Sequence, residues 1–248
     1  MTLISTLLLA SFVCMADNPV LLITGASTGI GAKTAQHAAE AGYRLVLGAR
    51  SEDKLESLAS ELGGPDKAIA VRSDVTEFED CEKLVTAATD AFGGFDAVFA
   101  NAGFGASRGF LEESPEHWKS MVLTNVLGVA YTIRATLPHL LEKGTGHFVI
   151  TSSVAGRRAL PGSLYSATKW SVTAMGEALR QELRQMHDNT RIRVTVIEPG
   201  MVDTPFFDDR PQGALEDEDI ARAVMYALSQ PEHVDVNEML IRPTKQPT

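Results

Sequence analysis

Short apolar runs alternate with longer helical segments along most of this chain, and this alternation limits the folds that it can adopt. Each run is only a few residues long, as buried strands are. Strands that alternate with helices predict one parallel sheet covered by helices on both faces. We therefore expect an α/β fold, with strands at 20–24, 45–47, 68–71, 97–100, 148–151, 194–197 and 239–241.

Helices are expected in the intervals between these strands, at 32–41, 51–62, 76–92, 115–141, 165–186 and 217–228. The longest of them carries Gly128 and Pro138, where we expect a bend. The segment 203–214 is rich in Pro, Asp and Phe and is expected to be an irregular loop. Because the sequence has no internal repeat, low-complexity segment or second domain, residues 17–248 are predicted to form one domain.

The composition is typical of a soluble globular protein, with 44% hydrophobic and 22% charged residues among 248. The net charge of −10 argues against nucleic acid and anionic membranes as partners. The two cysteines, Cys14 and Cys81, suggest neither a disulfide framework nor a zinc site. We therefore expect a cytoplasmic protein without a bound metal.

An apolar run, Leu3 to Ala16, precedes the first strand. It is too short for a normal transmembrane helix. It resembles the apolar part of a signal peptide, but no Lys or Arg comes before it. Three interpretations of residues 1–16 stay open: an upstream start with Met15 as the natural first residue, a signal or anchor, and ordinary structure.

A glycine-rich segment, Thr24 to Gly31, follows the first strand and opens the first helix. Its glycines permit a tight turn, and the helix N-terminus supplies N–H donors to a phosphate. The alternative is a glycine-rich connection that binds nothing. The predicted phosphate-binding residues are Gly25, Ser27, Thr28, Gly29, Ile30 and Gly31.

The second and third strands end at residues that suggest an adenosine site. No acid follows the second strand to bind a ribose 2′-hydroxyl, whereas Arg50, beside Ser51, could pair with a 2′-phosphate. Asp74 and Val75 could hold an adenine edge. The alternatives are a solvated arginine and an aspartate that only caps its turn.

Polar residues also follow the fourth, fifth and sixth strands, and the carboxyl ends of parallel strands meet at one sheet edge. These residues are Asn101, Ala102, Gly103, Ser152, Ser153, Pro199, Gly200, Val202 and Thr204. Asn125 lies inside a predicted helix, where asparagine is unfavourable and needs a reason.

Tyr165 and Lys169 are four residues apart and share a helix face. The ammonium should lower the pKa of the phenol, which suits proton transfer to or from an alcohol or carbonyl.

Together these motifs, in this order, resemble the short-chain dehydrogenase/reductase family from about Val20 to the C-terminus. The resemblance implies a single-domain, doubly wound Rossmann fold with a seven-stranded parallel sheet and a homotetramer or homodimer. It also implies a nicotinamide cofactor, held by the residues named above together with Tyr165 and Lys169. Because Ala49 stands where NAD-dependent relatives carry an acid, and Arg50 beside it could hold a 2′-phosphate, NADP(H) is the predicted cofactor.

The family also implies roles for four residues. Tyr165 is the general acid/base, Lys169 binds the nicotinamide ribose and lowers the Tyr pKa, and Asn125 positions a water of a proton relay. A serine holds the substrate oxygen. Spacing from Tyr165 favours Ser152, but counting through the fifth strand favours Ser153, and we predict Ser153 because deletions occur more easily in loops than in strands.

The tail, 232–246, resembles the subgroup of 3-hydroxy acid, serine and clavulanate dehydrogenases. That resemblance implies an NADP(H)-dependent oxidoreductase that interconverts a secondary alcohol and a carbonyl on a small polar substrate. Two alternatives are a membrane-associated dehydrogenase of lipid- or steroid-like substrates and a cofactor-binding sensor without catalysis.

Overall fold

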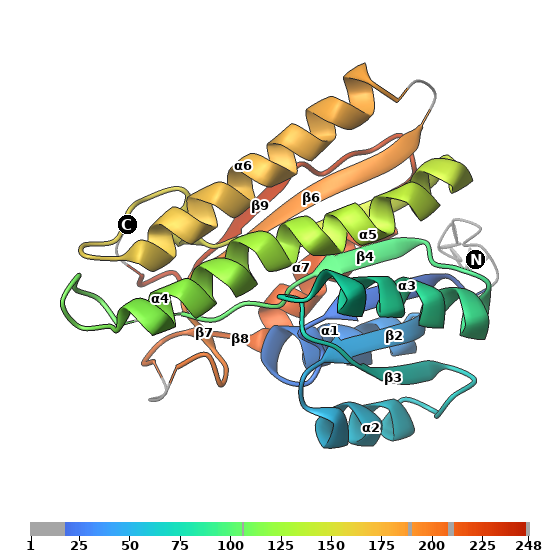
Figure 1. Cartoon of the computed structure of the whole chain (residues 1–248), viewed down its shortest axis with the longest axis horizontal. Helices are drawn as coiled ribbons and strands as arrows, with labels where there is room; N and C mark the ends of the chain where they lie inside the picture. Colours follow the sequence, from blue (N-terminus) through green and yellow to red (C-terminus); the bar gives the residue numbers. More distant parts are fainter. Residues whose placement is uncertain (1–17, 106, 188–189, 208–210, 247–248) are drawn as a thin grey trace, which may run out of the picture.

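The computed structural model describes residues 18–105, 107–187, 190–207 and 211–246. Within this part of the chain, seven parallel strands form one sheet in the order β3-β2-β1-β4-β5-β6-β9 (Figure 1). These strands are β1 (Val20–Thr24), β2 (Arg44–Ala49), β3 (Ala68–Arg72), β4 (Ala97–Ala100), β5 (Thr145–Thr151), β6 (Arg191–Pro199) and β9 (Glu238–Ile241). The predicted α/β class and the seven-stranded parallel sheet are confirmed.

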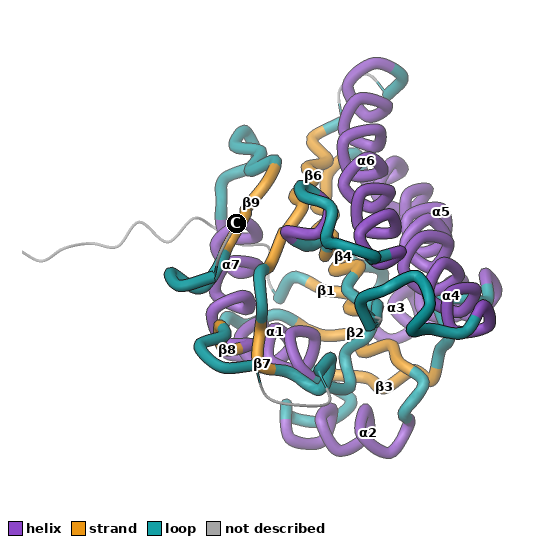
Figure 2. The backbone as a smooth tube through the Cα atoms, turned by 90° about the vertical axis from the view of Figure 1, so that its left-hand side faces the viewer, coloured by secondary structure: helices purple, strands orange, loops and turns teal. Residues whose placement is uncertain are grey.

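Helices cover both faces of the sheet, as Figure 2 shows with the sheet seen nearly edge-on. One face carries α1 (Gly29–Glu40), α2 (Glu52–Glu61) and α7 (Asp217–Ser229). The other carries α3 (Phe78–Phe92), α4 (Pro115–Val122), α5 (Gly128–Lys143) and α6 (Leu164–Gln185). Both faces are therefore buried, and the fold is doubly wound as predicted.

Alternate residues of each central strand enter different cores, because successive strand side chains point to opposite faces. In β1, Leu21 and Ile23 pack with residues of α1, α2 and α7. Val20 and Leu22 pack instead with residues of α3, α5 and α6. All four side chains are at most 2% exposed. A strand buried on both faces has no polar alternation, which explains why the sequence shows continuous apolar runs.

The predicted long helix at 115–141 is interrupted. A π-helical turn, η1 (Leu123–Leu127), separates α4 from α5. Pro138 lies inside α5, which continues to Lys143. A π-turn holds an extra residue compared with an α-helix, and such turns are common at functional sites.

The predicted loop at 203–214 is partly ordered by a small second sheet. Val202–Asp203 (β7) pairs in parallel with Leu215–Glu216 (β8). Two-residue strands have too little pattern to be read from sequence.

The apolar segment 1–16 lies outside the described residues. Among the helices that are described, none combines the length and apolarity needed to cross a membrane.

Candidate active site

The chain reverses its winding direction between β1 and β4, which are neighbours in the sheet. Open parallel sheets bind ligands at the carboxyl end of such a switch point. The register pairs Thr24, the last residue of β1, with Ala100, the last residue of β4. The glycine-rich turn and the segment 101–103 therefore leave the sheet side by side.

Backbone geometry explains the glycines of the turn after β1. Gly25 and Gly29 have positive φ angles of 68° and 53°, which side chains other than glycine rarely adopt. A Cβ atom at Gly31 would lie 2.2 Å from the carbonyl oxygen of Gly25. The N-cap residue of α1, Thr28, makes no side-chain cap hydrogen bond. The first-turn N–H groups of α1 are thus free of that cap, which fits an anionic group such as a diphosphate.

Asn101 ties this turn to the neighbouring strands. Its side-chain Nδ2 donates to the carbonyl oxygens of Thr24 and Gly25, at 3.3 and 3.4 Å. Its Oδ1 accepts from the Thr151 hydroxyl at 3.1 Å. The Asn101 side chain therefore holds the ends of β1, β4 and β5 together, and its direct contact with a cofactor stays a prediction.

The predicted adenosine residues differ in how firmly they are held. Arg50 and Ser51 are exposed, and Arg50 forms no ion pair within the described ranges. The Oδ1 atom of Asp74 accepts hydrogen bonds from the N–H and hydroxyl of Thr76, so Asp74 caps its own turn. Val75 is buried, and a Cβ atom at Gly128 would lie 2.6 Å from its Cγ2. Asp74 thus adopts the capping alternative, and an adenine contact remains untested.

Tyr165 and Lys169 lie on the first two turns of α6, which Ser163 caps by accepting a hydrogen bond from the Ser166 N–H. The Lys169 side chain is 4% exposed, and its Nζ donates to the Thr151 carbonyl oxygen at 2.9 Å. The same Nζ lies 5.7 Å from the centre of the Tyr165 ring. The helical spacing therefore brings the two side chains together as predicted.

Burial shifts both pKa values toward the neutral forms. It raises the pKa of Tyr165 to about 12, although a hydrogen bond with the Ser153 side chain opposes this shift. It lowers the pKa of Lys169 to about 8. The lowering of the Tyr165 pKa by the Lys169 ammonium therefore stays a prediction, because burial moves this pKa in the opposite direction.

The two adjacent serines face different surroundings. The Ser152 hydroxyl donates to the Lys169 carbonyl oxygen at 3.0 Å and lies 2.7 Å from the Thr173 hydroxyl oxygen. The Ser153 Oγ instead accepts from the Ala155 N–H at 3.1 Å and donates to the Pro199 carbonyl oxygen at 3.4 Å. Its side chain also lies close enough to Tyr165 to oppose the rise in the tyrosine pKa. Ser152 therefore links the end of β5 to α6. The Ser153 side chain lies beside that of Tyr165.

Asn125 lies in the π-turn η1 and is fully buried. Its Oδ1 accepts from the Phe104 N–H at 3.0 Å, and its Nδ2 donates to the Phe104 carbonyl oxygen at 2.8 Å. A Cβ atom at Gly103 would lie 3.1 Å from Asn125 Oδ1 and 3.5 Å from Lys169 Nζ. Because residue 103 has no side chain, the backbone there can approach these two polar side chains closely.

The segment after β6 returns to the glycine-rich turn. A Cβ atom at Gly29 would lie 3.2 Å from Cβ and Cγ2 of Thr204. Val202 is buried in the small sheet, and the Gly200 N–H donates to the Ile241 carbonyl oxygen at 2.7 Å. Pro199 is the last residue of β6. Among these predicted cofactor residues, Thr204 lies against the glycine-rich turn.

One residue beside Tyr165 was not predicted. Phe206 lies edge-on to the Tyr165 ring, with 5.6 Å between the ring centres. The only sequence signal was the aromatic pair Phe206 and Phe207 in the segment that follows the sixth strand.

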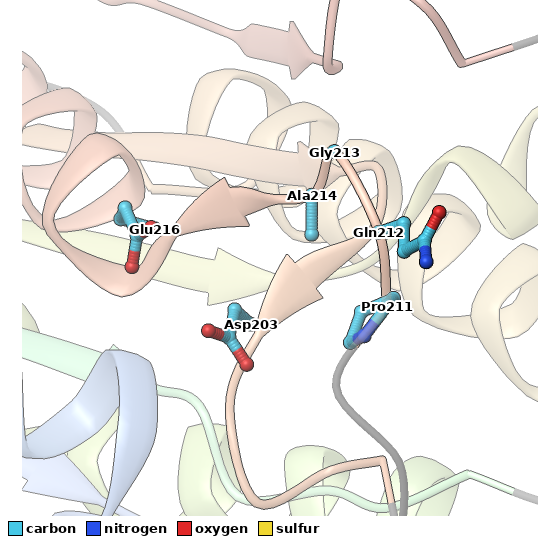
Figure 3. Close-up of a pocket in the computed structure, with 6 residues that line it drawn as sticks. All are labelled: Asp203, Pro211, Gln212, Gly213, Ala214 and Glu216. Atoms are coloured by element: carbon cyan, nitrogen blue, oxygen red, sulfur yellow. The ribbon is translucent and has the colours of Figure 1, made fainter.

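A separate pocket of about 320 Å³ lies between β7, β8 and their connection (Figure 3). Its lining residues are Asp203, Pro211, Gln212, Gly213, Ala214 and Glu216. None of the predicted catalytic residues is among them. The chemistry predicted from the sequence therefore belongs to the sheet edge rather than to this pocket.

Comparisons with known proteins agree with this geometry. A family model described as short chain dehydrogenase matches residues 19–214. An uncharacterized oxidoreductase of Staphylococcus aureus strain MRSA252 is 39% identical over 228 residues, which cover 90% of this chain and 96% of that protein.

Solved structures are similar over nearly the whole chain. An alcohol dehydrogenase from the archaeon Thermococcus sibiricus, complexed with 5-hydroxy-NADP, is 34% identical with a TM-score of 0.83, covering 93% of this chain and 98% of that one. A short-chain dehydrogenase/reductase from Burkholderia phymatum in complex with NAD is 28% identical with a TM-score of 0.81, covering 90% and 89%. This chain belongs to the short-chain dehydrogenase/reductase family of oxidoreductases.

Proposed function

We propose that this protein is an NADP(H)-dependent reductase that interconverts a carbonyl and a secondary alcohol on a small substrate, with Tyr165 as the general acid/base. The observation that carries the proposal is the proximity of the Tyr165 and Ser153 side chains at the carboxyl edge of the sheet, with Lys169 beside the Tyr165 ring. Lys169 lies behind this pair, and the glycine-rich turn lies at the same edge.

In the reductive direction, Tyr165 donates its proton to the substrate oxygen as negative charge develops there. The Ser153 hydroxyl donates a hydrogen bond to the same oxygen. Burial raises the pKa of Tyr165 to about 12, so the phenol is protonated at neutral pH and has a proton to donate. In the direction of oxidation the same group, once deprotonated, accepts the proton of the alcohol.

Lys169 and Asn125 act on the surroundings of Tyr165 and Ser153. When Tyr165 gives up its proton, the Lys169 ammonium stabilises the phenolate that is left. Asn125 holds the backbone of Phe104, and hence the segment next to Gly103, in a fixed place. Its positioning of a water in a proton relay is a further prediction from the family.

A bound nicotinamide cofactor would supply the hydride. The turn after β1 and the uncapped N-terminus of α1 would hold its diphosphate. Lys169 would bind the nicotinamide ribose, and Thr204 would lie near the nicotinamide. Arg50 would contact a 2′-phosphate, because it is exposed at the end of β2 and no acid stands beside it.

The tail resemblance supports a small polar substrate, and the family supports a homodimer or homotetramer, with the cytoplasm as the expected compartment. The lipid-substrate alternative depended on residues 1–16, which the structure does not describe. The sensor alternative has no observation in its favour, because Ser153, Tyr165 and Lys169 are all present and close together.

The test is a screen of aldehydes and ketones with NADPH and NADH, measured as loss of reduced-cofactor absorbance. Tyr165→Phe serves as the matched control, because it removes the proton and keeps the ring. Turnover by the wild type that is lost in this variant, with NADPH still quenching or shifting protein fluorescence in both, supports the proposal. Cofactor binding without turnover of any carbonyl would favour the sensor alternative instead.

A further inference from the structure

Phe206 occupies the space beside the Tyr165 ring. The two rings meet edge to face, with 5.6 Å between their centres and 65° between their planes. Phe206 follows Thr204, which packs against Gly29, by only two residues. Two residues of the same segment therefore contact two different parts of the predicted site: Thr204 contacts the glycine-rich turn, and Phe206 contacts Tyr165.

A glycine on the opposite loop makes room for this ring. A Cβ atom at Gly105 would lie 2.6 Å from Cζ and 2.7 Å from Cε1 of Phe206, closer than real Cβ contacts occur. The Gly105 backbone is itself held, because its carbonyl oxygen lies 3.1 Å from Nε2 of His117. The Phe206 ring thus reaches from the segment after β7 to the segment after β4, and it fits there because residue 105 has no side chain.

Phe206 is not an ordinary core residue. It is 40% exposed, although it contacts Tyr165, Gly105 and Phe207. A loop anchor would gain stability by full burial, since apolar area contributes only when it is removed from water. The exposed part of the ring is therefore available to another apolar group, on a ring that contacts Tyr165.

We propose that Phe206 is a specificity-determining residue, whose ring, seated against Gly105, forms the apolar wall of the substrate site beside Tyr165. A substrate whose oxygen reaches Tyr165 and Ser153 places one of its two arms against this wall. An apolar arm, such as a phenyl group, gains contact there, whereas a carboxylate arm placed against the ring loses hydration and receives no hydrogen bond from it. This proposal rests on the proposed function and departs from the small polar substrate that the tail resemblance supports, because it assigns the carbonyl compound one apolar arm.

The experiment uses pairs of small ketones that differ in one arm, phenyl in one member and carboxylate in the other. For each pair we would measure the ratio of kcat/KM, phenyl over carboxylate, with NADPH. The wild type should favour the phenyl member. Phe206→Ala should lower this ratio by about tenfold or more, as expected for the loss of one apolar contact. Gly105→Ala should lower it in the same direction, because its Cβ displaces the ring.

Phe78→Ala is the matched control. Phe78 makes an equivalent edge-on contact with Tyr131, at 5.6 Å and 71°, on another part of the molecule. Its loss should leave the ratio unchanged, and any effect on cofactor affinity cancels within a pair.

A wild type that prefers the carboxylate members, or a Phe206→Ala variant with an unchanged ratio, would overturn this inference alone. Absence of carbonyl turnover in the wild type would overturn the proposed function as well. If Gly105→Ala does not fold, Phe206→Ala decides the question.

Discussion

Two ends of the same sheet edge are built in different ways. At the tyrosine end, which comprises Asn125, Ser153, Tyr165 and Lys169, the side chains pack closely and hydrogen bond with protein groups. At the arginine end, which comprises Arg50, Ser51 and Asp74, the described contacts are local turns, and Arg50 is exposed without an ion pair to the described residues.

The difference has a physical basis. A buried polar group must be paired, so each substitution at the tyrosine end leaves a partner without its hydrogen bond. An exposed side chain at the arginine end can change with little cost to folding. We infer that the proton chemistry is fixed by packing, whereas the choice of cofactor can change by a few surface substitutions.

The largest effect is expected for Tyr165→Phe. Loss of a general acid reduces rates by roughly 10²–10⁴-fold. The ring and its contacts remain, so NADPH affinity should change little. Steady-state kinetics and fluorescence titration would separate these effects, and activity within a few-fold of the wild type would show that another group supplies the proton.

The two serines should separate activity from stability. Ser153→Ala should lower kcat by about ten- to a hundredfold, the worth of one hydrogen bond to a charged oxygen. Ser152→Ala should keep most of kcat but lower the unfolding temperature, because Thr173 and the Lys169 carbonyl lose their partner. Parallel kinetics and thermal melts test this, and a larger kcat loss in Ser152→Ala would reverse our assignment.

The arginine end should control the cofactor. Arg50→Ala should weaken NADPH binding by roughly tenfold or more, since a charge-assisted hydrogen bond is worth about 1.5–3 kcal/mol. Adding Ala49→Asp should shift preference toward NADH, because an acid can bind the 2′-hydroxyl and repels a phosphate. The kcat/KM of each variant with both cofactors is the measurement. A wild type that favours NADH would contradict our interpretation of the second strand.

The smallest effect concerns pH and Lys169. Its pKa is about 8 in the folded protein but about 10.4 in an unfolded chain. Between these values the unfolded chain binds more protons, so the stability contributed at this site rises with pH, by at most about 1.4 kcal/mol per unit. Tyr165 opposes this only above about pH 10, where unfolded tyrosine begins to ionise.

Urea unfolding of wild type and Lys169→Met between about pH 8 and 9.5 would measure this contribution. The difference in the free energy of unfolding between the two proteins should change with pH in favour of the wild type. A difference that stays constant across the window would show that Lys169 is not shifted as the buried geometry implies.

The sheet and its helices could be predicted because their signals are local. A strand buried on both faces must be apolar throughout, and a turn with positive φ must carry glycine, as at Gly25 and Gly29. The spacing of Tyr165 and Lys169 also suffices, since helix geometry alone puts them on one face.

The remaining features depend on contacts between distant segments. Phe206 meets Tyr165 through a loop whose path no pattern records, and its fit depends on Gly105, about a hundred residues away. The pairing of β7 with β8 joins two-residue strands across an irregular connection. The raised pKa of Tyr165 follows from burial, and the sequence spacing of Tyr165 and Lys169 does not reveal how buried the two side chains are.

The π-turn at Leu123–Leu127 also limits how the chain can vary in length. Deleting one residue there would give a continuous α-helix with better hydrogen bonds. It would also change the direction in which the side chains of residues 123–127 leave the helix, because a π-turn holds one more residue than an α-turn. Asn125 would then turn away from the backbone of Phe104, which it holds on both sides. A deletion that improves the helix would therefore dismantle the site, so this stretch should tolerate substitutions far better than changes in length.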